Sequence, residues 1–323
     1  MNAMKRMGGL RRAAAAAMAA AMALSLAACG SASSETQSSA AGSQAAAESQ
    51  EAGSAAEGSS AAAGTASGED VSGGDGTLTV AMECAYAPYN WTQGDDSNGA
   101  VQIKDSKDYA NGYDVMMAKK IADALGLKLE IVKSDWDSLV PAVQSGTVDC
   151  VIAGQSITKE RQQSVDFSEP YYYASVVAVT KKDSKYAAAK GVKDLSGATV
   201  TSQLNTIWYN NCLPQIPDAN ILAAQESAPA MLMALETGRV DAIVTDEPTA
   251  MAATIAYPDM VMLDFSGSDD DFQVSDEDVN IGISMKKGNT ALKEKIDEVL
   301  STMNADDYKE LMNEAISIQP LSK

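Results

Sequence analysis

Arg161 stands at a point of the chain where a positive charge is unexpected unless an anion lies nearby. It belongs to residues 154–161, a polar stretch that follows an apolar strand. Thr158 is predicted to cap a short helix, which places Arg161 in its first turn, where the helix dipole and free amides disfavour a cation. A guanidinium offers two parallel donors that match a carboxylate. The placement predicts a carboxylate clamp, and the alternative is a salt bridge to Asp166 or Glu169.

Asp246 is the matching acidic candidate, directly after a predicted strand over residues 241–245. Pro248 stands early in the next helix, so Asp246 could be a helix N-cap. It could also pair with a ligand ammonium, because a desolvated amine needs a formal negative charge and further acceptors. The hydroxyl of Ser156 and the carbonyl of Gly154 could be those acceptors.

A second polar group of residues, 203–206, follows the predicted strand over residues 198–201. A helical stretch is expected from about Ile207, and backbone amides at its start could complete a carboxylate site from the opposite side. Asn205 or Thr206 could instead merely cap that helix.

Aromatic side chains are sparse, and Tyr86, Tyr89, Trp91 and Trp136 are a large part of them. Tyr86 and Trp136 lie just beyond predicted strand ends and are interpreted as walls of a ligand pocket. Tyr89 and Trp91 are interpreted as core residues.

The composition excludes several kinds of chemistry. The chain contains no histidine, which removes Ser/His/Asp and Cys/His catalysis and His-ligated zinc, so neither a cofactor nor a metal is expected. Beyond residue 28 the side chains sum to 20 positive and 44 negative, a net charge of 20 − 44 = −24, which disfavours nucleic acid as a partner. Cys84, Cys150 and Cys212 are interpreted as buried thiols, with a Cys84–Cys150 bridge left open.

Short β-branched runs alternate with amphipathic helical segments along the remainder of the chain. Strands are predicted at 78–82, 129–132, 148–153, 176–180, 198–201, 241–245 and 281–285, and helices at 115–125 and about 138–144. This alternation predicts α/β lobes with mostly parallel sheets, in which ligands bind at the carboxyl ends of the strands. The 247 residues from 77 to 323 suffice for two such lobes.

The N-terminus carries targeting features. Residues 1–28 combine early Lys and Arg with an apolar run too short to span a bilayer, and they end in Leu-Ala-Ala before Cys29. This looks like a lipoprotein signal peptide with lipidation at Cys29. Residues 29–76 are a Ser/Ala/Gly-rich linker that cannot bury a core, so we expect a disordered tether.

These residues closely resemble bacterial extracellular solute-binding proteins of the polar amino-acid type (family 3), which serve ABC importers. The resemblance covers essentially all of 77–323 and rests on runs at residues 111–114 (Asn-Gly-Tyr-Asp), 136–142, 146–149 (Gly-Thr-Val-Asp), 154–158, 160–161, 165–172, 239–242 (Arg-Val-Asp-Ala) and 246. Their order and spacing are far more specific than one short motif.

The resemblance implies a type II periplasmic-binding-protein-like fold with two α/β lobes joined by two crossovers. It places lobe 1 at residues 77–177 and 277–323 and lobe 2 at 178–276, with the crossovers near 173–178 and 276–280. It implies Arg161 as the carboxylate clamp and Asp246 as the ammonium partner. The other ligand-binding residues are then Ser156, Gly154, Thr206, Ile207, Tyr86, Trp136, Glu83 and Gln203.

The ligand is expected to be a free, polar L-amino acid, and three positions bear on its side chain. Glu83 matches a position that is often acidic in members recognising cationic or amide side chains, which favours Arg, Lys or Gln. Asn205 and Gln155 depart from the residues common in the family, where Gly and an apolar residue or Met are frequent.

The function expected from this resemblance is capture of the amino acid and delivery to an ABC permease. The chain is predicted to be a monomer outside the cytoplasm, held to the cell membrane through Cys29, and not an enzyme. Two alternatives share the fold: a periplasmic enzyme like the cyclohexadienyl or arogenate dehydratases, for which Glu83 is the candidate general acid, and a sensory ligand-binding module.

Overall fold

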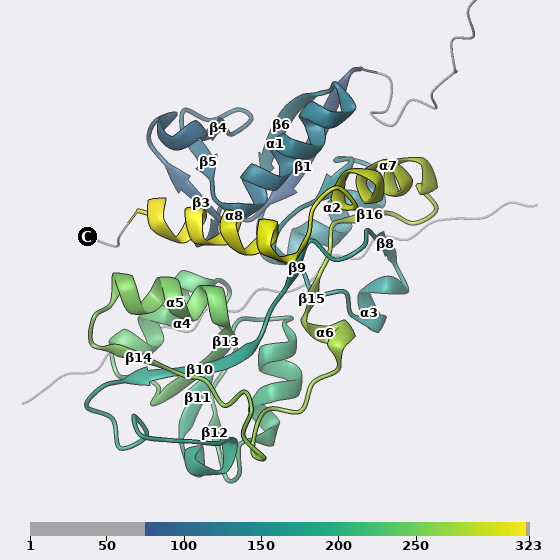
Figure 1. Cartoon of the computed structure of the whole chain (residues 1–323). Coiled ribbons are helices and arrows are strands. Elements are labelled where there is room, and N and C mark those ends of the chain that lie inside the picture. The colour runs from purple at the N-terminus through teal and green to yellow at the C-terminus, as the bar shows by residue number, and fades with distance from the viewer. Residues whose placement is uncertain (1–74, 321–323) are drawn as a thin grey trace, which may run out of the picture. The chain divides into compact units, whose positions relative to one another are not determined.

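The computed structural model describes residues 75–320 (Figure 1). The predicted signal peptide, Cys29 and the linker up to residue 74 lie outside the described residues. The helices are α1 (Tyr113–Leu125), α2 (Leu139–Ser145), α3 (Lys159–Gln162), α4 (Ala228–Glu236), α5 (Glu247–Ala256), α6 (Asp276–Val279), α7 (Thr290–Leu300) and α8 (Ala305–Ile318).

Two five-stranded sheets with the same topology form the framework, and we call the parts around them lobe 1 and lobe 2. The lobe 1 sheet has the order β6-β1-β7-β16-β8, in which only β16 runs antiparallel to its neighbours. Its strands are β1 (Thr77–Met82), β6 (Lys128–Lys133), β7 (Cys150–Val151), β8 (Val165–Phe167) and β16 (Ser284–Lys286).

The lobe 2 sheet repeats this arrangement in the order β12-β11-β13-β10-β14, with only β10 antiparallel. Its strands are β10 (Val176–Lys181), β11 (Thr199–Thr201), β12 (Asn220–Ile221), β13 (Ala242–Asp246) and β14 (Met260–Leu263). The prediction of mostly parallel sheets is therefore correct, and each sheet has one reversed strand in the same place.

Strand β10 of lobe 2 starts with four apolar residues in succession because both of its faces are covered. In β10, Val177 and Val179 pack into the core that includes α4 and α5, whereas Val176 and Ala178 pack into a second core with Trp208. A strand buried on both faces reads as a continuous apolar run instead of an alternating one.

A small antiparallel sheet in lobe 1 lies beside the first strand and carries Tyr86. It has the order β2-β3-β5-β4, with strands β2 (Ala85–Tyr86), β3 (Asn90–Gln93), β4 (Val101–Gln102) and β5 (Tyr109–Asn111). The helix predicted at 115–125 follows it as α1 and ends at Gly126 in the left-handed conformation, φ 68°.

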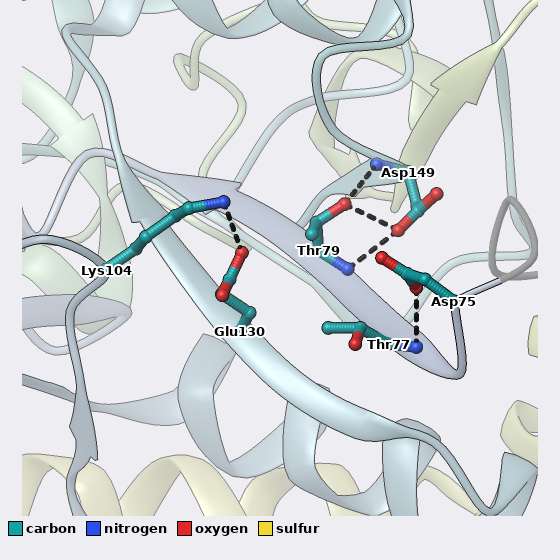
Figure 2. A network of polar contacts seen from close by, with 6 residues as sticks. All are labelled: Asp75, Thr77, Thr79, Lys104, Glu130 and Asp149. Carbon is teal, nitrogen blue, oxygen red and sulfur yellow. Dashed lines mark hydrogen bonds and ion pairs between the residues drawn. The ribbon is translucent and has the colours of Figure 1, made fainter.

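A matching Gly-x-Val-Asp run occurs once in each lobe, and its aspartate fastens the start of a neighbouring strand. The carboxylate of Asp149 accepts hydrogen bonds from the backbone amide of Thr79, at 2.7 Å, and from its hydroxyl (Figure 2). In lobe 2 the carboxylate of Asp241 accepts from the amide of Thr199 at 2.8 Å. Both aspartates lie at the ends of the sheets away from the strand carboxyl ends, so they hold the framework together.

Two antiparallel strands, β9 (Tyr172–Tyr173) and β15 (Asn280–Ile281), pair where the chain passes between the sheets (Figure 1). Strand β10 begins at Val176, two residues before the lobe boundary expected at 178. We call the β9–β15 pair the hinge ribbon.

Three sequence expectations differ from the structure. Of the strand expected at 148–153, only Cys150–Val151 is a strand. The strand expected at 281–285 is divided into β15 and β16 around Gly282, because this segment leaves the hinge ribbon before it enters the sheet. The helix expected from about Ile207 is a five-residue π-helical turn, Trp208–Cys212.

Candidate ligand-binding site

Arg161 reaches across the space between the lobes. Its Nη1 donates to the carbonyl of Ser156 at 2.9 Å, and its Nη2 donates to the carbonyl of Asn205 in lobe 2, also at 2.9 Å. The guanidinium carbon lies 5.4 Å from the centroid of the Trp136 ring, within the range of a cation–π contact. The helix that carries it is capped by Thr158 as expected, since the Thr158 hydroxyl accepts from the Arg161 amide at 3.2 Å.

The salt-bridge alternative for Arg161 does not occur. Asp166 instead pairs with Lys287 at 3.0 Å and accepts from the amide of Gly288. Among the acidic side chains that the structure describes, none lies within 4.0 Å of the guanidinium nitrogens of Arg161. Burial lowers the pKa of Arg161 to about 10, so the group stays cationic at neutral pH. A partly buried cation that lacks a counter-ion is left poorly compensated.

Asp246 has the geometry of a helix cap. Its Oδ1 accepts from the amide of Thr249 at 2.9 Å and its Oδ2 from the hydroxyl of Thr249 at 3.0 Å, at the start of α5. The hydroxyl of Tyr86, from lobe 1, donates to the same Oδ2. Burial raises the pKa of this carboxyl, which is 1% exposed. The cap interpretation is therefore realised, and Tyr86 stands between the carboxylate and the space between the lobes.

Thr206 also serves as a local cap. Its hydroxyl donates to the carbonyl of Gln203 at 2.8 Å and accepts from the amide of Tyr209 at 3.3 Å. Asn205 adopts a left-handed conformation, φ 55°. Its side-chain Nδ2 donates to Oδ1 of Asp137 in lobe 1 at 2.7 Å. Asn205 thus contacts lobe 1 through its side chain and, through its carbonyl, Arg161.

Glu83 is a nearly buried carboxyl group, 5% exposed, at the carboxyl end of β1. Its Oε2 accepts from Nε2 of Gln203 in lobe 2 at 3.3 Å. Burial raises the pKa of Glu83 to about 7, a shift that Asp135 reinforces and Lys133 opposes. The group is therefore poised to change its charge near neutral pH.

Gly154 occupies a tight turn that needs glycine. Its φ is 63°, and a Cβ at this position would lie 2.9 Å from a ring carbon of Tyr86. Its amide donates to the hydroxyl of Tyr171 at 3.0 Å. The glycine lets the Tyr86 ring pack directly on the loop.

Seven of the ten predicted ligand-binding residues line one small cavity between the lobes. They are Tyr86, Trp136, Gly154, Ser156, Arg161, Gln203 and Thr206, and Trp208 joins them. Three predicted residues do not line it: Glu83 lies behind Gln203, Asp246 lies behind Tyr86, and Ile207 lines an adjoining groove that also contains Arg161, Thr206 and Trp136. Trp208 was missed; its place directly after residues 206–207, as one of three tryptophans, was the available signal.

The core assignments made beside the site are correct. Tyr89 and Trp91 are buried at 1% and 4% exposure, and Tyr89 stacks on Tyr86 with ring centroids 4.9 Å apart. Cys84 and Cys150 are buried and free, so the bridge left open between them is absent.

Two α/β lobes of identical topology, joined by paired crossovers around a polar cavity, define a solute-binding protein of the type II periplasmic class. The family model of bacterial extracellular solute-binding proteins, family 3, matches residues 78–317, and the chain belongs to this family. The family, the fold class and the substrate-binding role predicted from the sequence are confirmed.

Three similar proteins illustrate the range of the family. A probable histidine-binding protein of Campylobacter jejuni is 32% identical over 57% of this chain and 66% of its own length. An amino acid ABC transporter substrate-binding protein of Streptococcus pneumoniae, solved with L-arginine, shares 28% identity and a TM-score of 0.65 over 75% of this chain and 94% of that one. An ancestral amino-acid-binding protein described as a precursor of cyclohexadienyl dehydratase shares 32% identity and a TM-score of 0.60 over 75% and 96%.

Proposed function

We propose that this protein captures a free L-amino acid with a cationic side chain between its lobes and delivers it to an ABC permease. The observation that carries the proposal is the Arg161 guanidinium, which lines the cavity and has no acidic partner among the side chains that the structure describes. Its two carbonyl contacts hold it in place without neutralising it. A ligand carboxylate supplies the missing charge and can accept two parallel hydrogen bonds.

The ammonium of the ligand belongs on the Asp246 side of the cavity. Asp246 is a buried acid that lies one hydrogen bond behind Tyr86. A ligand ammonium would replace or join the Tyr86 hydroxyl at the carboxylate, helped by the carbonyl of Gly154 and the hydroxyl of Ser156. Arg161 in lobe 1 and Asp246 in lobe 2 would then hold the two charged ends of one zwitterion, which favours closure of the lobes.

Glu83 supports a cationic side chain. A carboxylate that is 5% exposed and has one hydrogen bond of 3.3 Å is poorly compensated when ionised. A guanidinium or ammonium at the end of the ligand would compensate it. The relative from Streptococcus pneumoniae was solved with L-arginine, which agrees with this chemistry.

The ligand is tested by isothermal titration and thermal shift with L-arginine, L-lysine, L-glutamine, L-histidine and L-cystine. L-Citrulline, which has the shape of arginine without its charge, is the matched control. We expect L-arginine or L-lysine to bind most tightly, and a ligand at 100 times its Kd to add about 2.7 kcal/mol of stability. Failure of every amino acid to bind would overturn the proposed function, and equal binding of arginine and citrulline would overturn the role of Glu83.

A second function, dehydratase-like catalysis, is favoured by one observation. The pKa of Glu83 is raised to about 7 by burial, so this group can hold a transferable proton near neutral pH. One amino-acid-binding protein of similar structure is described as a precursor of cyclohexadienyl dehydratase. Incubation with prephenate or arogenate, followed by chromatography, separates the two functions: we expect no product.

The membrane anchor rests on the N-terminal sequence. Membership of an extracellular family fits the predicted signal peptide, and among residues 75–320 no helix could span a bilayer. We propose that cleavage before Cys29 and lipidation of its thiol hold a monomer at the outer face of the cell membrane. Cys29→Ala should release the protein from membranes upon expression, and a variant that stays in the membrane fraction would contradict the anchor.

A further inference from the structure

The loop that carries Gly154 and Ser156 is hydrogen-bonded to the hinge ribbon as an additional strand. The carbonyl of Gln155 accepts from the amide of Gly282 at 3.0 Å, and the amide of Ile157 donates to the carbonyl of Asn280 at 2.9 Å. Asn280 itself pairs with Tyr173 across the ribbon. The cavity wall of lobe 1 is thereby continuous with the strands about which the lobes would turn.

Tyr171 ties the other end of the same loop to the hinge ribbon. It directly precedes β9, and its amide donates to the carbonyl of Ile281 at 2.9 Å. Its hydroxyl accepts from the amide of Gly154 at 3.0 Å and donates to Oδ1 of Asp114 at 2.6 Å. Oδ2 of Asp114 accepts from the side-chain amide of Asn90 at 2.7 Å. The Tyr171 hydroxyl therefore links Gly154, which lines the cavity, to the carboxylate of Asp114. Tyr171 is itself bonded to the hinge ribbon through its backbone amide.

This group is isolated from water. Tyr171 and Asp114 are 0% exposed, and Asn90 is 0% exposed as well. Burial raises the pKa of Asp114 to about 6, so the carboxylate is ionised at neutral pH and accepts charge-assisted hydrogen bonds. Such bonds, kept away from solvent, hold their partners more rigidly than neutral ones at a surface.

We propose that Tyr171 and Asp114 are positioning residues that fix the Gly154–Ser156 turn to the hinge ribbon and so set the geometry of the amino-acid site. Neither side chain lines the cavity. They act on it through the turn, because the carbonyl of Ser156 in turn holds Arg161 at 2.9 Å. This inference rests on the proposed function and extends it from the residues that line the cavity to the hinge ribbon. A small displacement of such a turn would misplace the clamp.

The test compares two tyrosine-to-phenylalanine variants that each delete one buried hydroxyl. Tyr171→Phe breaks the link between Gly154 and Asp114. Tyr113→Phe is the matched control, because Tyr113 is equally buried and stacks on Tyr171 with centroids 5.7 Å apart, but its hydroxyl donates only to the Tyr171 carbonyl. Loss of stability alone would affect both variants.

Two measurements are made on parent and variants. The first is hydrogen exchange of the Gly154 amide by NMR without ligand, which we expect to accelerate at least tenfold in Tyr171→Phe and less than threefold in Tyr113→Phe. The second is the Kd for L-arginine, which we expect to rise at least tenfold only in Tyr171→Phe. Unchanged exchange of the Gly154 amide, or a Kd within twofold of the parent, would overturn the proposal.

A glycine variant tests the same linkage without touching the tyrosines. A Cβ on Gly282 would lie 2.6 Å from Cγ1 of Ile157, so Gly282→Ala should push the loop away from the hinge ribbon. Gly94→Ala is the control, since nothing lies within 4 Å of its Cβ. We expect Gly282→Ala to raise the Kd at least tenfold and the control to leave it unchanged, and equal Kd values would overturn the linkage.

The two proposals fail in distinguishable ways. If the parent binds no amino acid, the proposed function is wrong, and the Gly154 exchange experiment still decides whether Tyr171 fixes the turn. If the parent binds L-arginine and Tyr171→Phe binds it equally well, the proposed function stands and the positioning role is wrong.

Discussion

The hydroxyl of Tyr86 in lobe 1 donates a hydrogen bond to the carboxylate of Asp246 in lobe 2. The two residues lie 160 positions apart in the chain, and both are buried. Tyr86 lines the cavity and Asp246 does not. The aromatic wall and the proposed ammonium partner are thus a connected pair, and a ligand ammonium must approach Asp246 past Tyr86.

Replacement of Arg161 tests the carboxylate clamp. Arg161→Ala should weaken amino-acid binding by about 2 to 5 kcal/mol, because a ligand carboxylate would lose its charged partner in a desolvated site. The melting temperature should change little, since the guanidinium forms only two hydrogen bonds to carbonyls. Arg239→Ala, at an exposed position, is the matched control and should bind like the parent by titration calorimetry. Parent-like affinity in Arg161→Ala would remove Arg161 from the site.

Replacement of Asp246 by asparagine separates its charge from its cap. Asparagine caps a helix about as well as aspartate, so Asp246→Asn should keep α5 intact while weakening binding by about 2 to 5 kcal/mol. Calorimetry gives the affinity, and circular dichroism with thermal melting checks the fold. Tyr86→Phe removes only a neutral hydroxyl from the same carboxylate and should change the affinity less. The ammonium assignment is wrong if the asparagine variant binds as tightly as the parent.

Replacement of Glu83 tests the side-chain preference. Glu83→Gln should reduce the preference for L-arginine over L-citrulline, because the buried negative charge is lost. In the parent, the affinity for L-arginine should fall as the pH is lowered through about 7, where Glu83 takes up a proton. The variant should show no such dependence near pH 7. Glu130→Gln serves as control, because that carboxylate pairs with Lys104 at the surface (Figure 2).

The free energy of unfolding of the ligand-free protein should depend on pH because of Glu83. Its pKa is raised from 4.5 to about 7, so the folded state binds this proton more tightly than the unfolded chain does. Protonation of Glu83 therefore stabilises the folded state relative to the unfolded chain. This stabilisation is lost as the pH rises from about 4.5 to 7. Glu83→Gln, which stays neutral, should be more stable than the parent by on the order of 3 kcal/mol at pH 8 and equal to it at pH 4.5. Urea unfolding at both pH values measures this, and identical curves at pH 8 would show that Glu83 is not desolvated.

The Gly-x-Val-Asp runs show how a motif can identify a family without locating its site. The run at residues 146–149 contributed to the resemblance, yet Asp149 binds the start of β1, far along the sheet from the strand ends that carry the cavity. Asp241 does the same in lobe 2. Asp149 and Asp241 each precede a strand, whereas Asp246 ends β13, so the two kinds of acid lie at opposite ends of the sheets.

The helix caps show the reverse case. For Asp246 and Thr206 the sequence left capping and ligand binding open, and the structure shows that both residues cap. Thr206 nevertheless lines the cavity, whereas Asp246 reaches it only through Tyr86. A capping residue faces the cavity only if no residue of the other lobe covers it. The sequence around the cap does not show which residue of the other lobe lies opposite.

The sequence by itself determined the α/β alternation, the mostly parallel sheets, the core positions of Tyr89 and Trp91, and the family, because these follow from periodicity and from the order of short runs. Only the tertiary structure decided that Asp166 pairs with Lys287 and not with Arg161, that Tyr86 covers Asp246, and that the Tyr171 hydroxyl bonds Gly154. The physical reason is that charge compensation and burial depend on which groups the fold brings together. Asp166 meets Lys287, and Tyr86 meets Asp246, from more than a hundred positions away in the chain, and no local pattern encodes such contacts.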